Sequence, residues 1–124
     1  MKLYCDGYCI QKNPSDIGGG YTIVDEYNNL IKTKKILKQG LTNNEAELLG
    51  IYNALRKSKK NGIISSDSQC CIAWAKNGYA EARPDLNDIC WKSKLLLFKK
   101  NINLIWERRE LNLAGHYNES NYGF

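Results

Sequence analysis

Three acidic residues that lie far apart in the sequence are the side chains best suited to carry chemistry. Asp6 lies in the segment YCDG, Glu47 in TNNEAEL and Asp67 in SDSQ. Carboxylate oxygens are the ligands that Mg²⁺ takes in proteins, where the ion also keeps several waters. Two such ions about 4 Å apart can activate a water and stabilise the leaving oxygen of a phosphodiester. The residue types therefore predict metal-dependent phosphodiester chemistry, provided that the fold brings the three carboxylates together.

The predicted secondary structure places these acids at one edge of a sheet. Asp6 falls inside a strand, Glu47 in the first turns of a helix, and Asp67 at the carboxyl end of a later strand. In sheets that contain parallel strands, strand ends and helix starts gather at the same edge. A carboxylate inside a buried strand is costly unless a partner meets its charge, and one divalent cation can meet several carboxylates. The alternative is that Asp6 faces water or bonds to a turn.

Nine elements are predicted within a single domain that spans residues 1–124. The first three strands can pair by tight turns, whereas strands that are separated by helices pair in parallel. The sequence therefore predicts an α/β fold in which helices flank a five-stranded mixed sheet whose first three strands are antiparallel. The predicted strands cover residues 2–10, 21–24 (after a turn at 18–20), 30–37, 63–68 and 102–110, and the predicted helices cover residues 42–59, 69–78, a segment after Pro84 and a short part of the tail.

Four segments, YCDG, TNNEAEL, SDSQ and WERRELNLAG, resemble in their order and separation the four signature segments of type 1 ribonuclease H. The likeness covers nearly the whole chain, and the predicted order of strands and helices matches that family as well. No single segment is specific, but four in register point to the family. The resemblance implies a ribonuclease H-like fold. It also implies hydrolysis of the RNA strand of RNA–DNA hybrids at a carboxylate cluster that holds Mg²⁺, most simply two ions, with Mn²⁺ as a substitute.

The resemblance also implies roles for individual acids. Asp6, Glu47 and Asp67 occupy the first three acidic positions of the family, which are both catalytic and metal-binding. The family's glutamate is the one that precedes Leu48, so Glu45 is expected to be an acid that merely stabilises the positive end of the helix.

Polar side chains near these acids match positions that contact nucleic acid in the family. They are Asn43, Asn44 and Gln69. An amide can donate and accept hydrogen bonds, as a ribose 2′-hydroxyl does, which lets a protein tell RNA from DNA. The structural alternatives are helix capping for the asparagines and an ordinary helix start for Gln69. Arg109 is expected to contact a phosphate or to pair with Glu107 or Glu110.

The chain departs from the family pattern at the fourth acid. The family usually has an aspartate where this chain has Gly115 in the segment NLAG. Glu119 lies four residues further on and therefore on the same side of a helix, so its longer side chain could reach a second ion. The alternative is a solvated acid in the terminal helix. The only histidine, His116, is adjacent, but we expect it to be a partly exposed residue rather than a general base.

Composition and charge indicate the kind of partner and exclude some classes of protein. The formal charge of +5 and the bunched lysines suit a polyanionic partner, although the same charges could simply be a solvated surface. The five cysteines lack paired spacing and fit neither a disulfide framework nor a zinc site. We see no export signal and no apolar run near the ~20 residues that span a bilayer. The expectation is a cytoplasmic, monomeric protein that binds RNA–DNA hybrids and no membrane.

Two other functions are compatible with the sequence. One is a hybrid-binding module that has lost catalysis with its fourth acid. The other is a related nuclease that acts on double-stranded RNA or branched DNA. Retention of three acids argues against the module, because clustered carboxylates repel nucleic acid unless cations lie between them.

Overall fold

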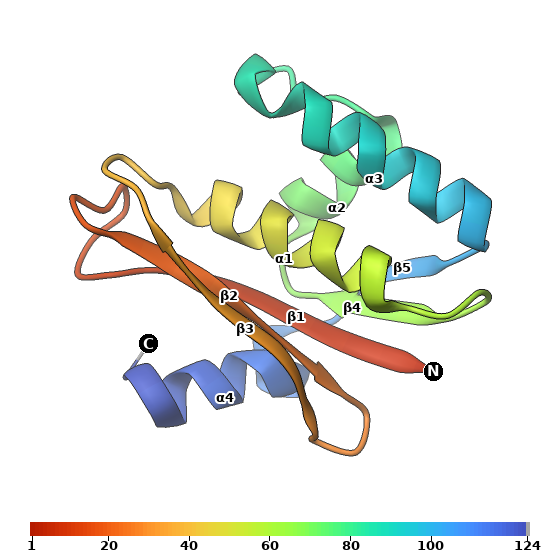
Figure 1. Cartoon of the computed structure of the whole chain (residues 1–124), viewed down its shortest axis with the longest axis horizontal. Helices are drawn as coiled ribbons and strands as arrows, with labels where there is room; N and C mark the ends of the chain where they lie inside the picture. The colour runs from red at the N-terminus through yellow and green to blue at the C-terminus, as the bar shows by residue number, and fades with distance from the viewer. Residues whose placement is uncertain (124) are drawn as a thin grey trace.

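A five-stranded mixed sheet forms the centre of the computed structural model, which describes residues 1–123 (Figure 1). The strand order is β3-β2-β1-β4-β5. β1 pairs antiparallel with β2, and β2 antiparallel with β3, whereas β4 runs parallel to both β1 and β5. The mixed sheet expected from the sequence is confirmed. The strands are β1 (Lys2–Cys9), β2 (Gly18–Asp25), β3 (Leu30–Leu37), β4 (Ile63–Ser66) and β5 (Asn103–Trp106).

Helices cover both faces of this sheet. Figure 1 shows α1, α2 and α3 on one side and α4 on the other. The central strand β1 contacts both α1 and α4, so nearly all of its residues are buried. Within residues 1–123, no helix is both long and apolar enough to cross a membrane. The helices are α1 (Asn43–Lys57), α2 (Gln69–Asn77), α3 (Asn87–Lys100) and α4 (Leu113–Tyr122), with short 3₁₀ turns at Pro84–Leu86 and Arg109–Leu111.

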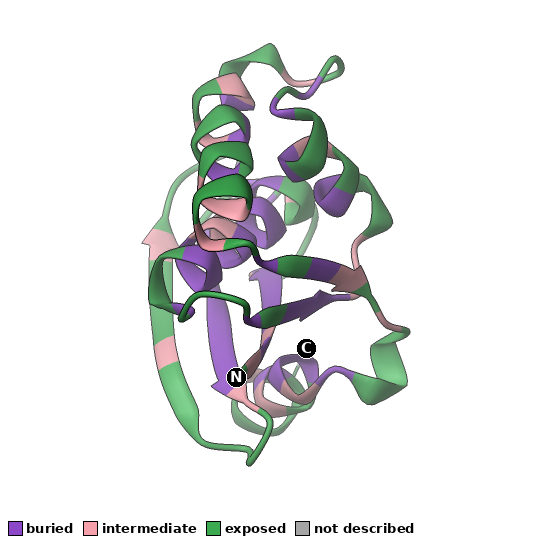
Figure 2. Cartoon of the chain, turned by 90° about the vertical axis from the view of Figure 1, so that its right-hand side faces the viewer, coloured by how far each residue is buried: buried purple, intermediate pink, exposed green. Residues whose placement is uncertain are grey.

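The main hydrophobic core lies between the sheet and α1. Leu3 and Cys5 of β1 pack with Leu48 and Ile51 of α1, and all four are completely buried. Full burial of such a leucine or isoleucine side chain stabilises the fold by about 1.5–3 kcal/mol. Figure 2 shows this pattern as buried segments of the sheet and inward-facing helix surfaces, with exposed residues on the outer faces.

The three consecutive glycines at residues 18–20 belong to β2, so the turn predicted there is wrong. A Cβ atom at Gly19 would overlap the carbonyl oxygen of Tyr8, and one at Gly20 would overlap the carbonyl oxygen of Lys34. Glycine is therefore needed here for close approach of neighbouring strands rather than for chain reversal.

Side chains close both ends of α1. Thr42 is the N-cap, and its Oγ1 accepts a hydrogen bond from the Glu45 backbone N–H at 3.2 Å. At the other end, Lys100 Nζ donates to the carbonyl oxygens of Leu55, Arg56 and Ser58 at 2.8–3.0 Å. A cation at a helix C-terminus stabilises the unpaired carbonyls and the helix dipole. The orientation of α1, which carries Glu47, is thus held from both ends.

Candidate metal centre

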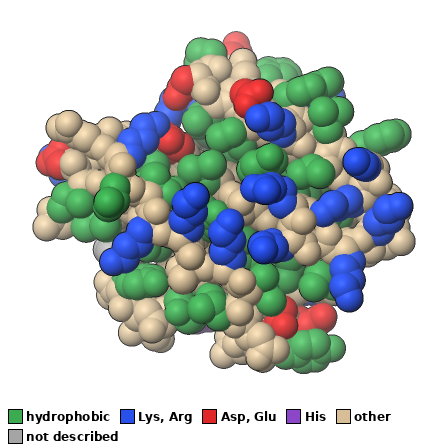
Figure 3. Space-filling view, in the orientation of Figure 1, with side chains coloured by type: hydrophobic (Ala, Val, Ile, Leu, Met, Phe, Trp, Pro, Cys, Tyr) green, Lys and Arg blue, Asp and Glu red, His purple; other side chains and the backbone are tan. Residues whose placement is uncertain are grey.

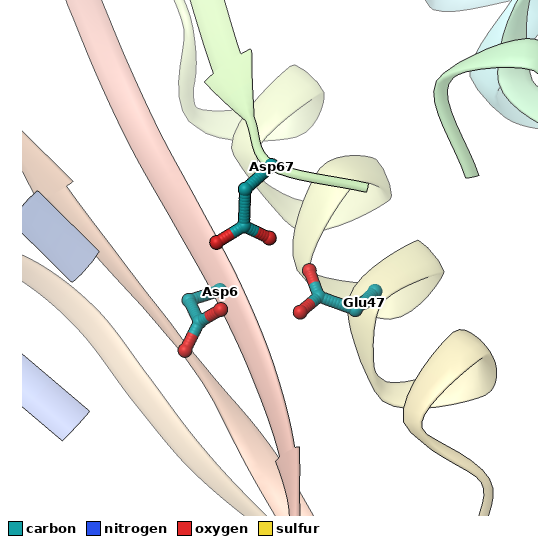
Figure 4. Close-up of side chains that lie close together, drawn as sticks. All are labelled: Asp6, Glu47 and Asp67. Atoms are coloured by element: carbon teal, nitrogen blue, oxygen red, sulfur yellow. The ribbon is translucent and has the colours of Figure 1, made fainter. Parts of the chain in front are cut away.

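The carboxylates of Asp6, Glu47 and Asp67 point toward one another (Figure 4). One oxygen from each lies within 4.8 Å of the others. Asp6 is 1% exposed and Glu47 is 8% exposed, while Asp67 is partly buried. They come from β1, from α1 and from the residue that follows β4. The convergence expected from the sequence is therefore confirmed.

Two features of the backbone produce this convergence. β1 and β4 are adjacent and parallel, so the chain leaving β4 passes beside Asp6. A Cβ at Gly7 would overlap the backbone of Ala46 and Glu47. Glycine next to Asp6 thus lets the first turns of α1 lie directly on β1, which places Glu47 beside Asp6.

Asn118 of α4 fixes the orientation of Asp6. Its Nδ2 donates to Asp6 Oδ2 at 2.8 Å, and its Oδ1 accepts from Thr22 Oγ1 at 2.6 Å. The side chain is completely buried. The role of Asn118 could not be predicted from the sequence, because nothing local distinguishes it from other polar residues of a terminal helix.

Asn112 connects Asp67 to the start of α4. Its Nδ2 donates to the Cys5 carbonyl at 3.0 Å and to Asp67 Oδ2 at 3.3 Å. Its Oδ1 accepts from the backbone N–H groups of Ala114 and Gly115, as the N-cap of the helix. This residue was also missed, although an asparagine immediately before a predicted helix is a capping signal.

Arg109 contacts the acids, although its side chain is still 42% exposed. Its Nη1 is 2.6 Å from Asp6 Oδ1 and 3.1 Å from Asp67 Oδ2, and its Nε is 3.6 Å from Glu119 Oε1. Instead of pairing with Glu107 or Glu110, the guanidinium neutralises part of the carboxylate cluster.

Glu119 reaches the cluster only through Arg109. Its side chain is 49% exposed, and among residues 1–123 it is not one of the acids whose oxygens converge. His116 is 51% exposed, and its Nε2–H donates to the Glu110 carbonyl at 2.7 Å. Because a carbonyl only accepts, this bond assigns the proton to Nε2. Neither side chain is placed as a direct neighbour of all three converging acids.

Burial has the largest effect on the pKa values of Asp6 and Glu47. It raises the pKa of Glu47 well above its usual range, and the nearby charges of Asp6 and Asp67 raise it further. Burial also raises the pKa of Asp6, while Arg109 and the Asn118 hydrogen bond oppose that rise. Burial lowers the pKa of Arg109, but attraction to Asp6 and Asp67 outweighs it, so the net direction is upward.

The cluster fits a divalent cation. Glu47 Oε2 is buried and has no hydrogen-bond partner in the described part of the chain. An unpartnered buried carboxylate oxygen is costly, and a cation shared with Asp6 and Asp67 would satisfy it. Three carboxylates form an all-oxygen donor set, which suits Mg²⁺ or Mn²⁺ rather than softer ions.

A pocket of about 490 Å³ opens beside the acids. Asn43 and Asn44 line it with exposed side chains, and neither caps α1, because Thr42 does. Gln69 is exposed at the start of α2 but is not part of the pocket wall. The complete lining is Gly7, Tyr8, Cys9, Asn43, Asn44, Glu47, Asp67, Ser68 and Arg109.

Glu45 has a structural role, as the sequence suggested. It forms ion pairs with Lys38 at 2.7 Å and with Arg83 at 3.2 Å, and among residues 1–123 it is not one of the acids whose oxygens converge. Arg83 also donates to Thr42 Oγ1 at 2.9 Å. Glu45 therefore holds the start of α1 in place.

Basic side chains gather on a second part of the surface. Figure 3 shows lysines and arginines in a band across the face that is seen in Figure 1. Two shallow pockets that share Tyr52 and Arg56 contain most of the residues concerned. We call these residues the basic band; they are Lys32, Lys34, Lys35, Arg56, Lys92 and Lys99.

Comparison with known proteins agrees with this architecture. The RNase H family model matches residues 1–114. RNase H1 from the halophilic archaeon Halobacterium salinarum gives a TM-score of 0.69 at 21% identity, covering 96% of this chain and 95% of that one. The N-terminal RNase H domain of a Mycobacterium tuberculosis protein gives 0.68 at 19% identity, covering 94% and 92%.

A third structural relative was solved with nucleic acid. LC11-RNase H1 in complex with an RNA/DNA hybrid gives a TM-score of 0.63 at 22% identity, covering 90% of this chain and 87% of that one. A search of curated proteins gave no match. The structural comparisons confirm the ribonuclease H-like fold expected from the sequence.

Proposed function

The chain belongs to the RNase H family, and on this premise we propose that it hydrolyses the RNA strand of RNA–DNA hybrids with a divalent cation. The convergence of Asp6, Glu47 and Asp67 is the observation that carries the proposal. The hybrid bound to LC11-RNase H1 supports the same substrate class here.

The three acids would hold Mg²⁺, or Mn²⁺ in its place. The bound ion would supply an activated water and neutralise charge at the scissile phosphate. Asn118 holds Asp6 and Asn112 holds Asp67, so the carboxylates are oriented before any ion arrives. Such hydrogen bonds to ligating groups are a large part of what tunes a metal site.

The proposed reaction is hydrolysis at the P–O3′ bond. The water oxygen forms a new bond to phosphorus, the P–O3′ bond breaks, and the proton of the water ends on the 3′-oxygen. The products carry a 5′-phosphate and a 3′-hydroxyl. The pocket beside the acids provides open access to an extended substrate.

Exposed amides beside the acids would select RNA. Asn43 and Asn44 can each donate to and accept from a 2′-hydroxyl at the pocket, and Gln69 would contact the nucleotide beyond it. The basic band would attract the nucleic acid through its phosphates, so binding is expected to weaken steeply with salt.

The test is cleavage of an end-labelled hybrid in Mg²⁺. Asp6→Asn should abolish cleavage while leaving hybrid binding intact, because Asp6 is 1% exposed and is not part of the pocket wall. Asp88→Asn is the matched control, because Asp88 is exposed and its one ion pair among residues 1–123 is with Lys92. Cleavage by the Asp6 variant at the wild-type rate would refute the proposed site.

The same assay separates the rival functions. The absence of an acid at Gly115 is the specific observation that favours a silent hybrid-binding module. Tight hybrid binding without cleavage in Mg²⁺ or Mn²⁺ would establish that reading. Faster cleavage of double-stranded RNA or branched DNA than of the hybrid, measured side by side, would identify that nucleic acid as the substrate in place of the hybrid.

A further inference from the structure

Arg109 fills the space next to the position that lacks an acid. A Cβ added at Gly115 would lie 3.2 Å from Arg109 Cζ and 3.3 Å from Nη1. Gly115 itself is buried in the first turn of α4. The volume into which a side chain at position 115 would project is therefore already occupied by the guanidinium group.

The guanidinium engages one side of the acid cluster and leaves the other side open. Nη1 contacts Asp6 and Asp67, and the other oxygen of Asp6 accepts from Asn118. Arg109 forms no ion pair with Glu47, whose Oε2 has no hydrogen-bond partner among residues 1–123. The remaining unmet oxygen thus lies on α1, opposite the helix that carries Gly115.

The formal charge of the site agrees with a guanidinium on one side of the acids and one metal ion on the other. Three carboxylates and one guanidinium leave a formal charge of −2, which one divalent cation neutralises. Four carboxylates without an arginine would carry −4, which two divalent cations neutralise. Relative to a site with four carboxylates, glycine at position 115 and the guanidinium of Arg109 together raise the formal charge from −4 to −2. This difference equals the charge of one divalent cation.

We propose that Arg109 is a built-in cation that stands in for a second metal ion, so that Asp6, Glu47 and Asp67 take up a single divalent cation. Its use in cleavage rests on the proposed function, but the number of ions does not. The ion pairs of 2.6 Å and 3.1 Å hold the guanidinium in place, and Glu119 adds a third contact at 3.6 Å.

The number of ions can be measured without any substrate. Mn²⁺ binding, followed by electron paramagnetic resonance and calorimetry on the full chain, should give one strong site per chain. In Arg109→Ala, the vacated space and the added negative charge should tighten Mn²⁺ binding by about tenfold, the scale on which a nearby charge shifts carboxylate proton affinity. The double variant Arg109→Ala with Gly115→Asp should bind two ions.

Metal-free stability provides an independent readout. Arg109→Ala should lower the melting temperature in chelator, because Asp6 loses its countercharge, whereas Arg109→Lys should retain most of it. Arg108→Ala is the matched control, because Arg108 is 68% exposed and, within the described residues, its only ion pair is with Glu110 at 3.8 Å. This control should leave both the Mn²⁺ titration and the melting temperature unchanged.

The outcomes are decisive in both directions. Two comparable Mn²⁺ sites in the wild type, or Arg109→Ala behaving like Arg108→Ala, would overturn the proposal. Failure of the wild type to cleave a hybrid while it still binds one Mn²⁺ would refute the proposed function and leave this inference standing.

Discussion

Asn118 and Asp6 are joined by a hydrogen bond of 2.8 Å between a helix on one face of the sheet and the central strand. Asn118→Ala removes this donor and leaves a buried carboxylate oxygen unpaired. We expect a loss of about 1–3 kcal/mol in the free energy of unfolding, together with a higher Mg²⁺ requirement. Urea denaturation and Mg²⁺ titration of cleavage measure both. Asn121→Ala is the control, because Asn121 is exposed and its side chain donates to the Tyr117 carbonyl rather than to an acid of the site. Equal losses in the two variants would contradict the positioning role of Asn118.

Glu47 should make the metal-free protein less stable as the pH rises. Its pKa is raised in the folded chain, so above its ordinary value of 4.5 the folded state keeps a proton that the unfolded state releases. The free energy of unfolding in chelator should therefore fall from that pH up to the folded pKa. Glu47→Gln should reduce this slope to the part that comes from the raised pKa of Asp6, as measured by urea denaturation across the range. Parallel curves for variant and wild type would show that Glu47 is not desolvated.

Gly7→Ala should damage both stability and metal binding. The added Cβ overlaps the backbone at Ala46 and Glu47, so α1 must move away from β1. Overpacking of this kind costs about 1–3 kcal/mol, and displacement of Glu47 should weaken Mn²⁺ binding. Gly50→Ala is the matched control on α1, because its Cβ would meet Tyr21 at an ordinary 3.4 Å. Retention of wild-type Mn²⁺ affinity by Gly7→Ala would count against close approach as the origin of the site.

Glu119→Gln is expected to leave the Mg²⁺ requirement for cleavage unchanged. In the structure this acid contacts Arg109 and is half exposed, so it does not lie among the converging carboxylates. The measurement is the Mg²⁺ dependence of hybrid cleavage. A clear rise in the requirement would instead restore Glu119 as the substitute for the fourth aspartate.

One cysteine should react rapidly with a thiol reagent in the native protein. Cys70 is exposed, whereas the other four cysteines are buried. Burial raises the pKa of Cys71 to about 12, and thiolate is the reactive form. Labelling with a chromogenic disulfide should consume one thiol before unfolding and all five afterwards. Rapid native labelling of Cys70→Ser would show that a second thiol is accessible.

Much of the site could be predicted from the sequence, because strand ends and helix starts determine where Asp6, Glu47 and Asp67 lie. The acids that Arg109 contacts could not be predicted, because they depend on the space beside Gly115 that remains once α4 packs on the sheet. Asn118 was missed for a similar reason: its burial arises only when α4 packs on β1. The turn predicted at residues 18–20 was wrong because glycine allows close strand contact as readily as chain reversal.

The lysines of β3 also affect whether the edge of the sheet can pair with another molecule. β3 is the outermost strand on its side of the sheet, and its unpaired backbone groups could template the addition of a strand from another molecule. Lys32, Lys34 and Lys35 lie along this open border. A second copy approaching in register would bring like charges together, so the side chains that we propose to attract a polyanion should also oppose self-association into aggregates.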